Sequence, residues 1–512
     1  MDTASWQAAR LIPVAGIRGQ EEQEARATSS FLAVLRAVPD LAYALFVELG
    51  APKGRIETFT EVRLSDAAGK SSRPDGAVVM SRGSRAWSAL IEVKTGTAEL
   101  TVEQTNRYLD LAREHGFAAV VTISNEITAT PTDSPVDFDK RKTKKVDLYH
   151  LSWWRILTTA IVQHRHRGIT DPDQAWILGE LIAYLDHENS GASGFRDMGS
   201  QWVTVRDGAR QGTLRAGEGT HSVVTHWEQY IDYLALGLSQ DLGGAVEAVR
   251  PKKQTLAERL AARTKELIDE GKLTGAIRIP DAAADMTLMA DLRARQVTTS
   301  AEVTAPRDGA RQLTRVNWLV RQLADAPSDV RLTAFFKGVR STSSVLLAEA
   351  RERPASLLSA DDPRREIRSF EVAVSRSLGM KNGRVKGSFV ADTRQQLIDF
   401  YGDVLQNVHA WQPAPRRLPA TPRPVEVSPQ PDPPPFAAAS EREVGEGRLP
   451  YDDEPSEADA TAATVDGFTQ VSEPASAPEF GSAASEPCPC ASSEPATARG
   501  NSVAHDPLDY GV

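Results

Sequence analysis

The sequence predicts an α/β fold in its N-terminal part, an α+β domain after it and a disordered tail at its end. Short apolar runs bounded by Gly and Pro are typical of strands, and residues 56–95 contain three of them. Apolar residues at helical spacing flank these runs at 21–49 and 101–115. From residue 412 onward the apolar periodicity disappears. We therefore expect four parts: a domain over 1–188, a linker over 189–222, an α+β domain over 223–411 and a tail over 412–512.

The N-terminal domain should begin with a helix over 21–49, because Phe31, Leu32 and Leu35 recur at helical spacing. Pro39 should break or redirect this helix, since proline disrupts a helix interior. A turn at 51–54 should then lead into three strands, the first two joined by a polar hairpin loop over 65–73. We expect these strands at Ile56–Leu64, Asp75–Ser81 and Ser88–Thr95.

A second helix is expected over Thr101–His115, because Thr101 and Gln104 have the spacing of a capping box. Gly116 should end this helix, and the β-branched run Ala118–Ser124 should form the next strand. The predicted order is therefore helix, three strands, helix and strand.

Residues 147–188 should pack on this core. We expect a strand over Val146–Leu151 and a helix over Trp153–His166. Asp171 followed by Pro172 is typical of a helix start, and this second helix should run to Leu185.

The part over 223–411 mixes helical and strand patterns, which favours an α+β domain with an antiparallel sheet. The expected helices are Thr225–Leu238, Leu256–Glu270, Gln312–Asp325, Pro363–Leu378 and Asp392–Val408. The expected strands are Ala276–Ile279, Thr287–Arg293, Val297–Ala305, Val330–Phe336 and Ser344–Glu352.

Charge is unevenly distributed along the chain. The formal net charge is −10, but residues 413–512 hold 6 Arg, no Lys and 17 acidic residues, a net charge of −11. The preceding residues are balanced, with 53 basic and 52 acidic side chains. A nucleic-acid-binding surface would therefore depend on local basic patches. The tail also holds 18 of the 31 Pro residues, a composition that favours disorder over a packed core.

The sequence also indicates where the protein works. No run of about 18 apolar residues is present, so we expect no membrane span. The first residues lack a basic stretch followed by an apolar one, so no secretory signal is expected. The two cysteines, Cys488 and Cys490, lie in the Pro- and Ser-rich tail and predict neither a disulfide framework nor a zinc site. We expect a cytoplasmic protein.

Two carboxylates and a lysine stand out in the predicted strands. Side chains alternate along a strand, so Glu92 and Lys94 should share one face while Ile91 and Val93 point into a core. If the strand that begins at Asp75 pairs with this one, Asp75 and Glu92 could share a hard divalent cation through oxygen ligands. Lys94 would lie at the edge of such a site. Pro-Asp-Gly at 74–76 is also a common turn sequence, so a structural role for Asp75 is the alternative.

The set Pro74-Asp75, a hydrophobic strand and Glu92-Val93-Lys94 resembles the PD-(D/E)xK nuclease superfamily, over residues 20–160. The resemblance implies a restriction-endonuclease-like αβββαβ core that hydrolyses DNA phosphodiester bonds by metal-activated water. Asp75, Glu92 and the carbonyl of Val93 would then be the ligands of Mg²⁺ or Mn²⁺, and Lys94 would position the water. Gln104 and Tyr108, one turn apart on the following helix, match a Gln and a Tyr that the family often has there.

The superfamily often adds a Glu from its first helix. Glu24 is our choice, because it shares a helical face with Phe31 and Leu35 and should point toward the sheet. The alternatives are Glu21, Glu22, Glu57 and Glu61.

The densest basic run could contact nucleic acid. It comprises Lys140, Arg141, Lys142, Lys144 and Lys145. As phosphate contacts, these side chains would give affinity without sequence choice. A solvated loop is the alternative.

Two classes of function follow. One is a metal-dependent nuclease that binds nucleic acid, with DNA as the expected partner. The other is a non-catalytic nucleic-acid or protein interaction protein on a nuclease-like scaffold. In either class, a protein partner would bind through 223–411 or the tail. The sequence leaves endonuclease and exonuclease both open.

The tail provides a first test. Removing residues 413–512 should leave the melting temperature nearly unchanged, because no buried area is lost. The shortened chain should keep any metal-dependent cleavage and should bind DNA more tightly at low salt, since 17 acidic residues are removed. Thermal denaturation of both chains measures the first effect, and a large drop in melting temperature would show that the tail packs on the body.

Overall fold

The computed structural model describes residues 10–66, 69–192, 194–251, 253–307, 311–381 and 383–412. These residues lie in one compact unit, Met1–Pro419, and form a mixed α/β structure with two large sheets. The expectation of a disordered tail falls on residues outside the described ones. Within the described ranges, no single helix is both long and apolar enough to cross a membrane; two core helices joined at a 105° bend pass that test only when counted together.

The first sheet has five strands in the order β1-β4-β5-β6-β7. Its members are β1 (Arg55–Thr60), β4 (Gly76–Arg82), β5 (Arg85–Val93), β6 (Ala119–Ser124) and β7 (Asp147–Ser152). β1, β4 and β5 pair antiparallel, whereas β6 and β7 continue the sheet in parallel. The loop predicted at 65–73 carries a small hairpin of β2 (Leu64–Ser65) and β3 (Ser71–Ser72).

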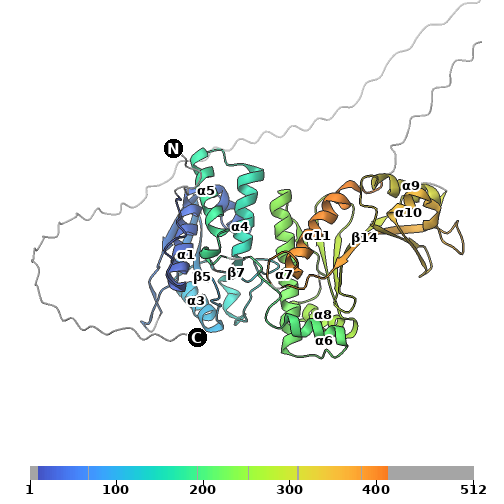
Figure 1. Cartoon of the computed structure of the whole chain (residues 1–512). Coiled ribbons are helices and arrows are strands. Elements are labelled where there is room, and N and C mark those ends of the chain that lie inside the picture. Colours follow the sequence, from blue (N-terminus) through green and yellow to red (C-terminus); the bar gives the residue numbers. More distant parts are fainter. Residues whose placement is uncertain are drawn as a thin grey trace, which may run out of the picture. The chain divides into compact units, whose positions relative to one another are not determined.

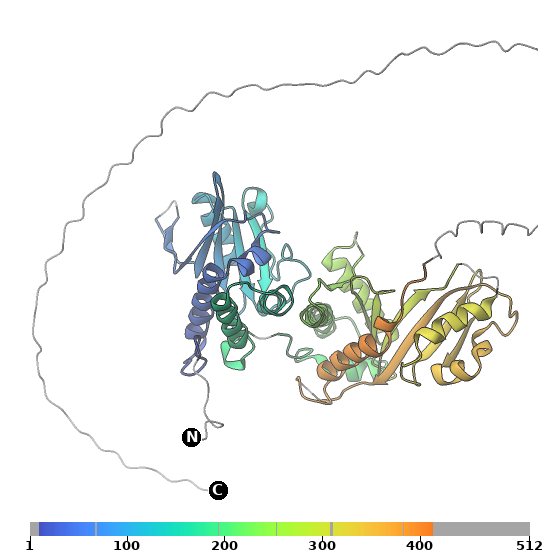
Figure 2. The same cartoon turned by 90° about the horizontal axis from the view of Figure 1, so that it is seen from above.

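Helices cover both faces of this sheet. On one face, α1 (Gln20–Ala37), α2 (Pro39–Phe46), α4 (Trp153–Val162) and α5 (Pro172–Leu185) join the larger apolar core, and α1, α4 and α5 lie together (Figures 1 and 2). On the other face, α3 (Val102–Glu114) forms a smaller core with Ala77, Leu90 and Val120. Because side chains alternate along a strand, Ile91 and Val93 face the larger core.

Three of these helices begin at the proline and capping residues that the sequence predicted. Pro39 is the first residue of α2, and α1 and α2 meet there at a 105° bend. Thr101 caps α3 by accepting a hydrogen bond from the backbone N–H of Gln104. Asp171 caps α5 in the same way, with Pro172 at its first position. The predicted helix Trp153–His166 consists of α4 followed by a π-helical turn at Gln163–Arg167.

The second sheet has seven antiparallel strands in the order β13-β12-β14-β11-β10-β9-β8, as an α+β domain predicts. The strands are β8 (Glu247–Ala248), β9 (Lys272–Arg278), β10 (Met286–Asp291), β11 (Gln296–Thr304), β12 (Arg331–Phe336), β13 (Thr342–Leu346) and β14 (Ile367–Ser377). The accompanying helices are α7 (Glu218–Leu242), α8 (Leu256–Glu270), α9 (Gln312–Gln322), α10 (Leu347–Glu352) and α11 (Phe389–Asp403).

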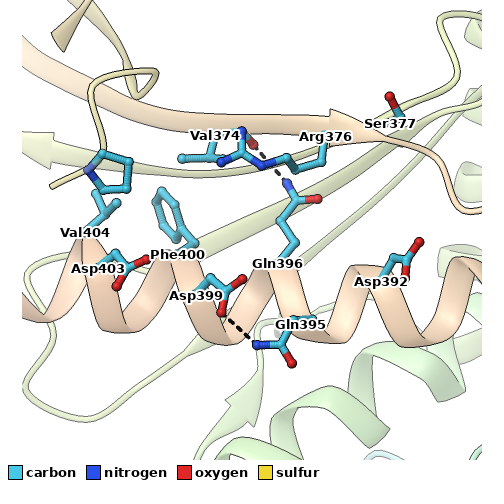
Figure 3. A pocket seen from close by; sticks show the side chains of 11 residues that line it. Val374, Arg376, Ser377, Asp392, Gln395, Gln396, Asp399, Phe400, Asp403 and Val404 are labelled. Carbon is cyan, nitrogen blue, oxygen red and sulfur yellow. Dashed lines mark hydrogen bonds between the residues drawn. The ribbon is translucent and has the colours of Figure 1, made fainter. Parts of the chain in front are cut away.

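Buried polar side chains tie these helices to the sheet. Gln396 of α11 donates to the carbonyl oxygens of Val297 and Val374, both at 3.0 Å. Figure 3 shows this side chain pointing from α11 toward β14, beside a pocket of about 290 Å³ between the two elements. Trp227 of α7 donates to the carbonyl oxygen of Thr274 in β9 at 2.8 Å.

Two predictions in this part are wrong. Pro363–Leu378, expected to be a helix, contains strand β14, which pairs with β11 and β12 on its two sides. Both faces of β14 are partly buried, so its apolar residues do not alternate cleanly and strand periodicity is obscured. The predicted strand Ser344–Glu352 ends at Leu346, and α10 follows, with Leu347 and Ala350 buried three residues apart.

The segment 189–222, predicted to be a linker, contains α6 (Trp202–Gln211), with Trp202 and Val205 buried. One apolar core includes residues from both sheets and from this segment. Trp154 of α4 packs on Tyr233 of α7, with ring centroids 4.7 Å apart and the rings tilted by 32°. The two sheets are therefore joined by packed side chains.

Candidate active site

The residues predicted to act together lie at one end of the first sheet. Asp75 immediately precedes β4, Glu92 is near the end of β5, and Lys94 follows that strand. Gln104 is in the first turn of α3, and Glu24 is in the second turn of α1. Asp75, Glu92, Lys94, Gln104 and Glu24 are linked by the contacts described below.

Strand pairing places Asp75 beside Glu92. Gly76 of β4 is opposite Ile91 of β5, so the next residue pair in this antiparallel register is Asp75 and Glu92. The Asp75 carboxylate also accepts a 2.7 Å hydrogen bond from the backbone N–H of Val93. The turn sequence around Asp75 therefore brings a carboxylate to the end of the neighbouring strand.

The Glu92 carboxylate is buried, and the hydrogen bonds that it accepts go to one of its two oxygens. The residue is 2% exposed, and its Oε1 atom accepts hydrogen bonds from Lys94 at 2.7 Å and from the side-chain amide of Gln104. Its Oε2 atom is buried and makes no hydrogen bond to the described residues, although the Tyr108 hydroxyl lies near the same carboxylate and favours its ionised form. Burial and the nearby Asp75 charge raise the pKa of Glu92 to about 7, against the opposing effect of Lys94.

Lys94 lies between two carboxylates. Its ammonium contacts Glu92 at 2.7 Å, the carbonyl oxygen of Val93 at 3.1 Å and Glu24 at 3.5 Å. Burial alone would lower the pKa of Lys94, but Glu92, Glu24 and Asp75 outweigh it and raise that pKa. Lys94 therefore stays charged at neutral pH.

Gln104 and Tyr108 of α3 face the same carboxylate. The Gln104 amide nitrogen reaches both Glu92 and, at 3.5 Å, the Tyr108 hydroxyl. Burial and the Glu92 charge raise the pKa of Tyr108, which keeps its hydroxyl protonated. Gln104 and Tyr108 therefore supply hydrogen-bond donors beside the Glu92 carboxylate.

Among the acidic candidates of the first helix, the structure brings Glu24 to Lys94. Glu22 instead accepts from the backbone N–H of Arg18 and pairs with Arg26. The other candidates lie elsewhere: Glu57 pairs with Arg55, Glu61 pairs with Arg73, and Glu21 is exposed.

The basic run lies along a different side of α3. Lys142 pairs with Asp110 of α3, and the backbone N–H of Asp139 donates to Asn106. Asn106 and Asp110 project from a different side of the helix than Gln104 and Tyr108, given about 100° per residue. The other members, Lys140, Arg141, Lys144 and Lys145, are exposed.

Sequence reasoning missed the residues that hold the chain just after Glu92. Trp153 donates to the carbonyl oxygen of Lys94 at 2.9 Å, and Gln20 donates to that of Thr95 at 3.2 Å. These residues are far from Lys94 in sequence and match no motif, so only the folded arrangement reveals them.

The donor set can be compared with what a metal ion needs. Within the described ranges, no group of three or more His, Cys, Asp or Glu residues is placed to hold a metal. Magnesium, however, keeps several waters and takes only one or two protein carboxylates. Asp75 and Glu92, with the unpartnered Glu92 Oε2 atom and the Val93 carbonyl, fit such a hydrated ion.

Comparison of the sequence with protein-family models and with curated proteins finds no match.

The buried Glu92 carboxyl predicts a pH-dependent stability. Its folded pKa of about 7 exceeds the ordinary 4.5, so its stabilising contribution is complete below pH 4.5 and is lost as pH rises through 7. In metal-free buffer, Glu92→Gln should therefore gain stability relative to wild type over this window, by about 3 kcal/mol. Urea unfolding from pH 4.5 to 8 measures this difference.

Glu103→Gln is the matched control, because Glu103 is an exposed residue next to Gln104. It makes the same change of side chain outside the buried site, so its urea unfolding measures the effect of the change alone. A pH profile of Glu92→Gln that does not differ from that of Glu103→Gln would show that Glu92 titrates normally.

Proposed function

We propose that residues 20–160 form a metal-dependent nuclease core of the PD-(D/E)xK type, which hydrolyses DNA phosphodiester bonds. The observation that carries this proposal is that Asp75, Glu92 and Lys94 meet at one end of the sheet, where Lys94 pairs with Glu92 Oε1 while the buried Oε2 atom makes no hydrogen bond to the described residues. Buried polar atoms are rarely left unpaired, so an unpaired one indicates a ligand or a catalytic role.

The topology supports the same proposal. β1, β4 and β5 pair antiparallel, α3 follows on the face opposite α1, and β6 pairs in parallel with β5. This is the order expected for a restriction-endonuclease-like core. In this arrangement the ends of β4 and β5 that carry the two carboxylates are neighbours. Fold resemblance alone does not establish an activity, so the argument depends on the side chains.

Asp75, Glu92 and the Val93 carbonyl would hold Mg²⁺ or Mn²⁺. The ion, when bound, would acidify a water molecule and offset charge on the phosphate. Two carboxylates in one site repel each other, which is one reason why the pKa of Glu92 is raised to about 7. A divalent cation there would favour the ionised form of both groups.

The remaining residues would orient the reacting groups. Lys94 would hold an attacking water or a phosphate oxygen with its ammonium, which Glu24 and Glu92 already fix in place. Gln104 would keep Glu92 Oε1 engaged, so that Oε2 is the oxygen directed to the ligand. At acidic pH, protonation of Glu92 would remove the negative charge that this role requires.

Substitution of the three central residues tests the proposal. Asp75→Asn, Glu92→Gln and Lys94→Met keep side-chain size but remove charge, and each should lower Mg²⁺-dependent cleavage on the order of 10²-fold or more. Labelled single- and double-stranded DNA and RNA, assayed with Mg²⁺ and with Mn²⁺, measure the loss.

Glu103→Gln, an exposed change on the same helix as Gln104, should cleave like wild type. Circular dichroism should show that every variant is folded. A wild-type protein that cleaves none of these substrates would instead favour the non-catalytic scaffold.

The basic run makes a separate prediction about binding. Replacing Lys140, Arg141, Lys144 and Lys145 by Gln should flatten the salt dependence of DNA binding by up to about 0.9 log–log units per lost phosphate contact. Lys142→Gln should have a smaller effect, because Asp110 already neutralises that side chain. Fluorescence anisotropy at several salt concentrations measures both slopes, and equal slopes in all proteins would identify a solvated loop.

A further inference from the structure

The loop Lys94–Gly96, directly after β5, is held by two helices, α4 and α1. Trp153 of α4 donates to the Lys94 carbonyl oxygen at 2.9 Å, and Gln20 of α1 donates to that of Thr95 at 3.2 Å. The Thr95 hydroxyl, fully buried, donates to Gln23 at 3.2 Å. The path of the chain beyond Lys94 is therefore fixed by hydrogen bonds on several sides.

Gly96 connects this loop to a segment far along the chain. Its backbone N–H donates to the carbonyl oxygen of Gly191 at 2.9 Å. The side-chain amide of Asn125, just after β6, donates to the carbonyl oxygens of both Gly96 and Gly191, at 3.0 and 2.8 Å. Because two carbonyl oxygens face this amide, only its NH₂ group can satisfy them.

Gly191 has a backbone conformation that favours glycine, and the side chain of Gln23 lies against it. Its φ is +70°, a conformation that side chains rarely adopt, and a Cβ there would overlap the side-chain amide of Gln23. The same amide of Gln23 donates to the carbonyl oxygen of Asn189 at 2.9 Å. Gln23 thus lies between the Lys94–Gly96 loop and the segment that carries Gly191.

The segment Glu188–Ala192 has its own local support. His187 caps the short helix Glu188–Ser190 by accepting from the backbone N–H of Asn189. The buried Ser190 hydroxyl donates to the Leu185 carbonyl and accepts from the backbone N–H of Ala192. This segment lies outside the residues 20–160 on which the family resemblance depends.

We propose that Asn125 and Gly191 are positioning residues for the proposed nuclease reaction, and that they act by fixing the loop that sets the place of Lys94. This inference rests on the proposed function. The Lys94 ammonium contacts Glu92 at 2.7 Å and Glu24 at 3.5 Å. The backbone of Lys94 directly precedes Thr95, so the contacts that fix the loop also fix the start of the lysine side chain. A site works only when its reacting groups are held to within about 0.5 Å, which needs a supporting layer of this kind.

Two variants release the loop in different ways. Asn125→Asp replaces the shared donor by an acceptor facing two carbonyl oxygens, and Gly191→Ala introduces a methyl group against Gln23. Gly212→Ala is the matched control, because Gly212 has the same φ of +70° and a similar left-handed conformation but nothing within 4 Å of an added Cβ.

The first readout is cleavage by the full chain with Mg²⁺. Asn125→Asp and Gly191→Ala should lower kcat on the order of 10-fold or more, as loss of a supporting residue does, while KM for DNA stays nearly unchanged. Gly212→Ala should match wild type in both constants. Folded variants with wild-type kcat would overturn the inference.

The second readout does not require activity. Backbone amide exchange at Lys94 and Gly96, followed by NMR, should accelerate in both variants, while exchange at Val121 in β6 should not. Unchanged exchange at Lys94 would overturn the positioning role even if Gly96 exchanges faster. A wild-type chain that cleaves no nucleic acid would reject the proposed function, and the exchange rates would still decide whether this segment controls the place of Lys94.

Discussion

The burial of one carboxylate, that of Glu92, is the constraint on which the rest of the site depends. A charge that is 2% exposed needs partners, and Lys94 and Gln104 both approach the same oxygen. The second oxygen is left unpaired, although a purely structural ion pair would gain by satisfying it. This unpaired oxygen is the reason why we propose a ligand at Glu92 and not a purely structural ion pair.

The packing of α1 against β4 brings the remaining groups to this carboxylate. A Cβ at Gly76 would lie 2.7 Å from the carbonyl oxygen of Phe59 and would collide with Leu32 of α1, so glycine allows a close approach of helix to sheet. The same approach carries Glu24 to within 3.5 Å of Lys94. Gly76, which has no side chain, thus allows the charged groups of α1 and the sheet to meet.

The sequence predicted the parts of this arrangement that depend on local pattern. Periodicity and caps predicted the strands around Glu92 and the start of α3 at Thr101, because neighbouring residues determine both. The same reasoning failed for β14, a strand between β11 and β12 that has buried residues on both faces, because burial on both faces hides the alternation. It could not find Asn125 and Gly191 either, since they are 66 residues apart and meet only through tertiary packing.

Consecutive tryptophans on α4 connect the site to the second sheet's domain. Trp153 donates to the carbonyl oxygen of Lys94 at 2.9 Å, and Trp154 donates to that of Tyr233 in α7 at 3.2 Å. Both side chains are buried, so neither can move far without disturbing packed neighbours. Adjacent residues of one helix therefore contact the Lys94 loop and the helix α7, so the 20–160 region contacts the rest of the chain through the same helix that holds its lysine.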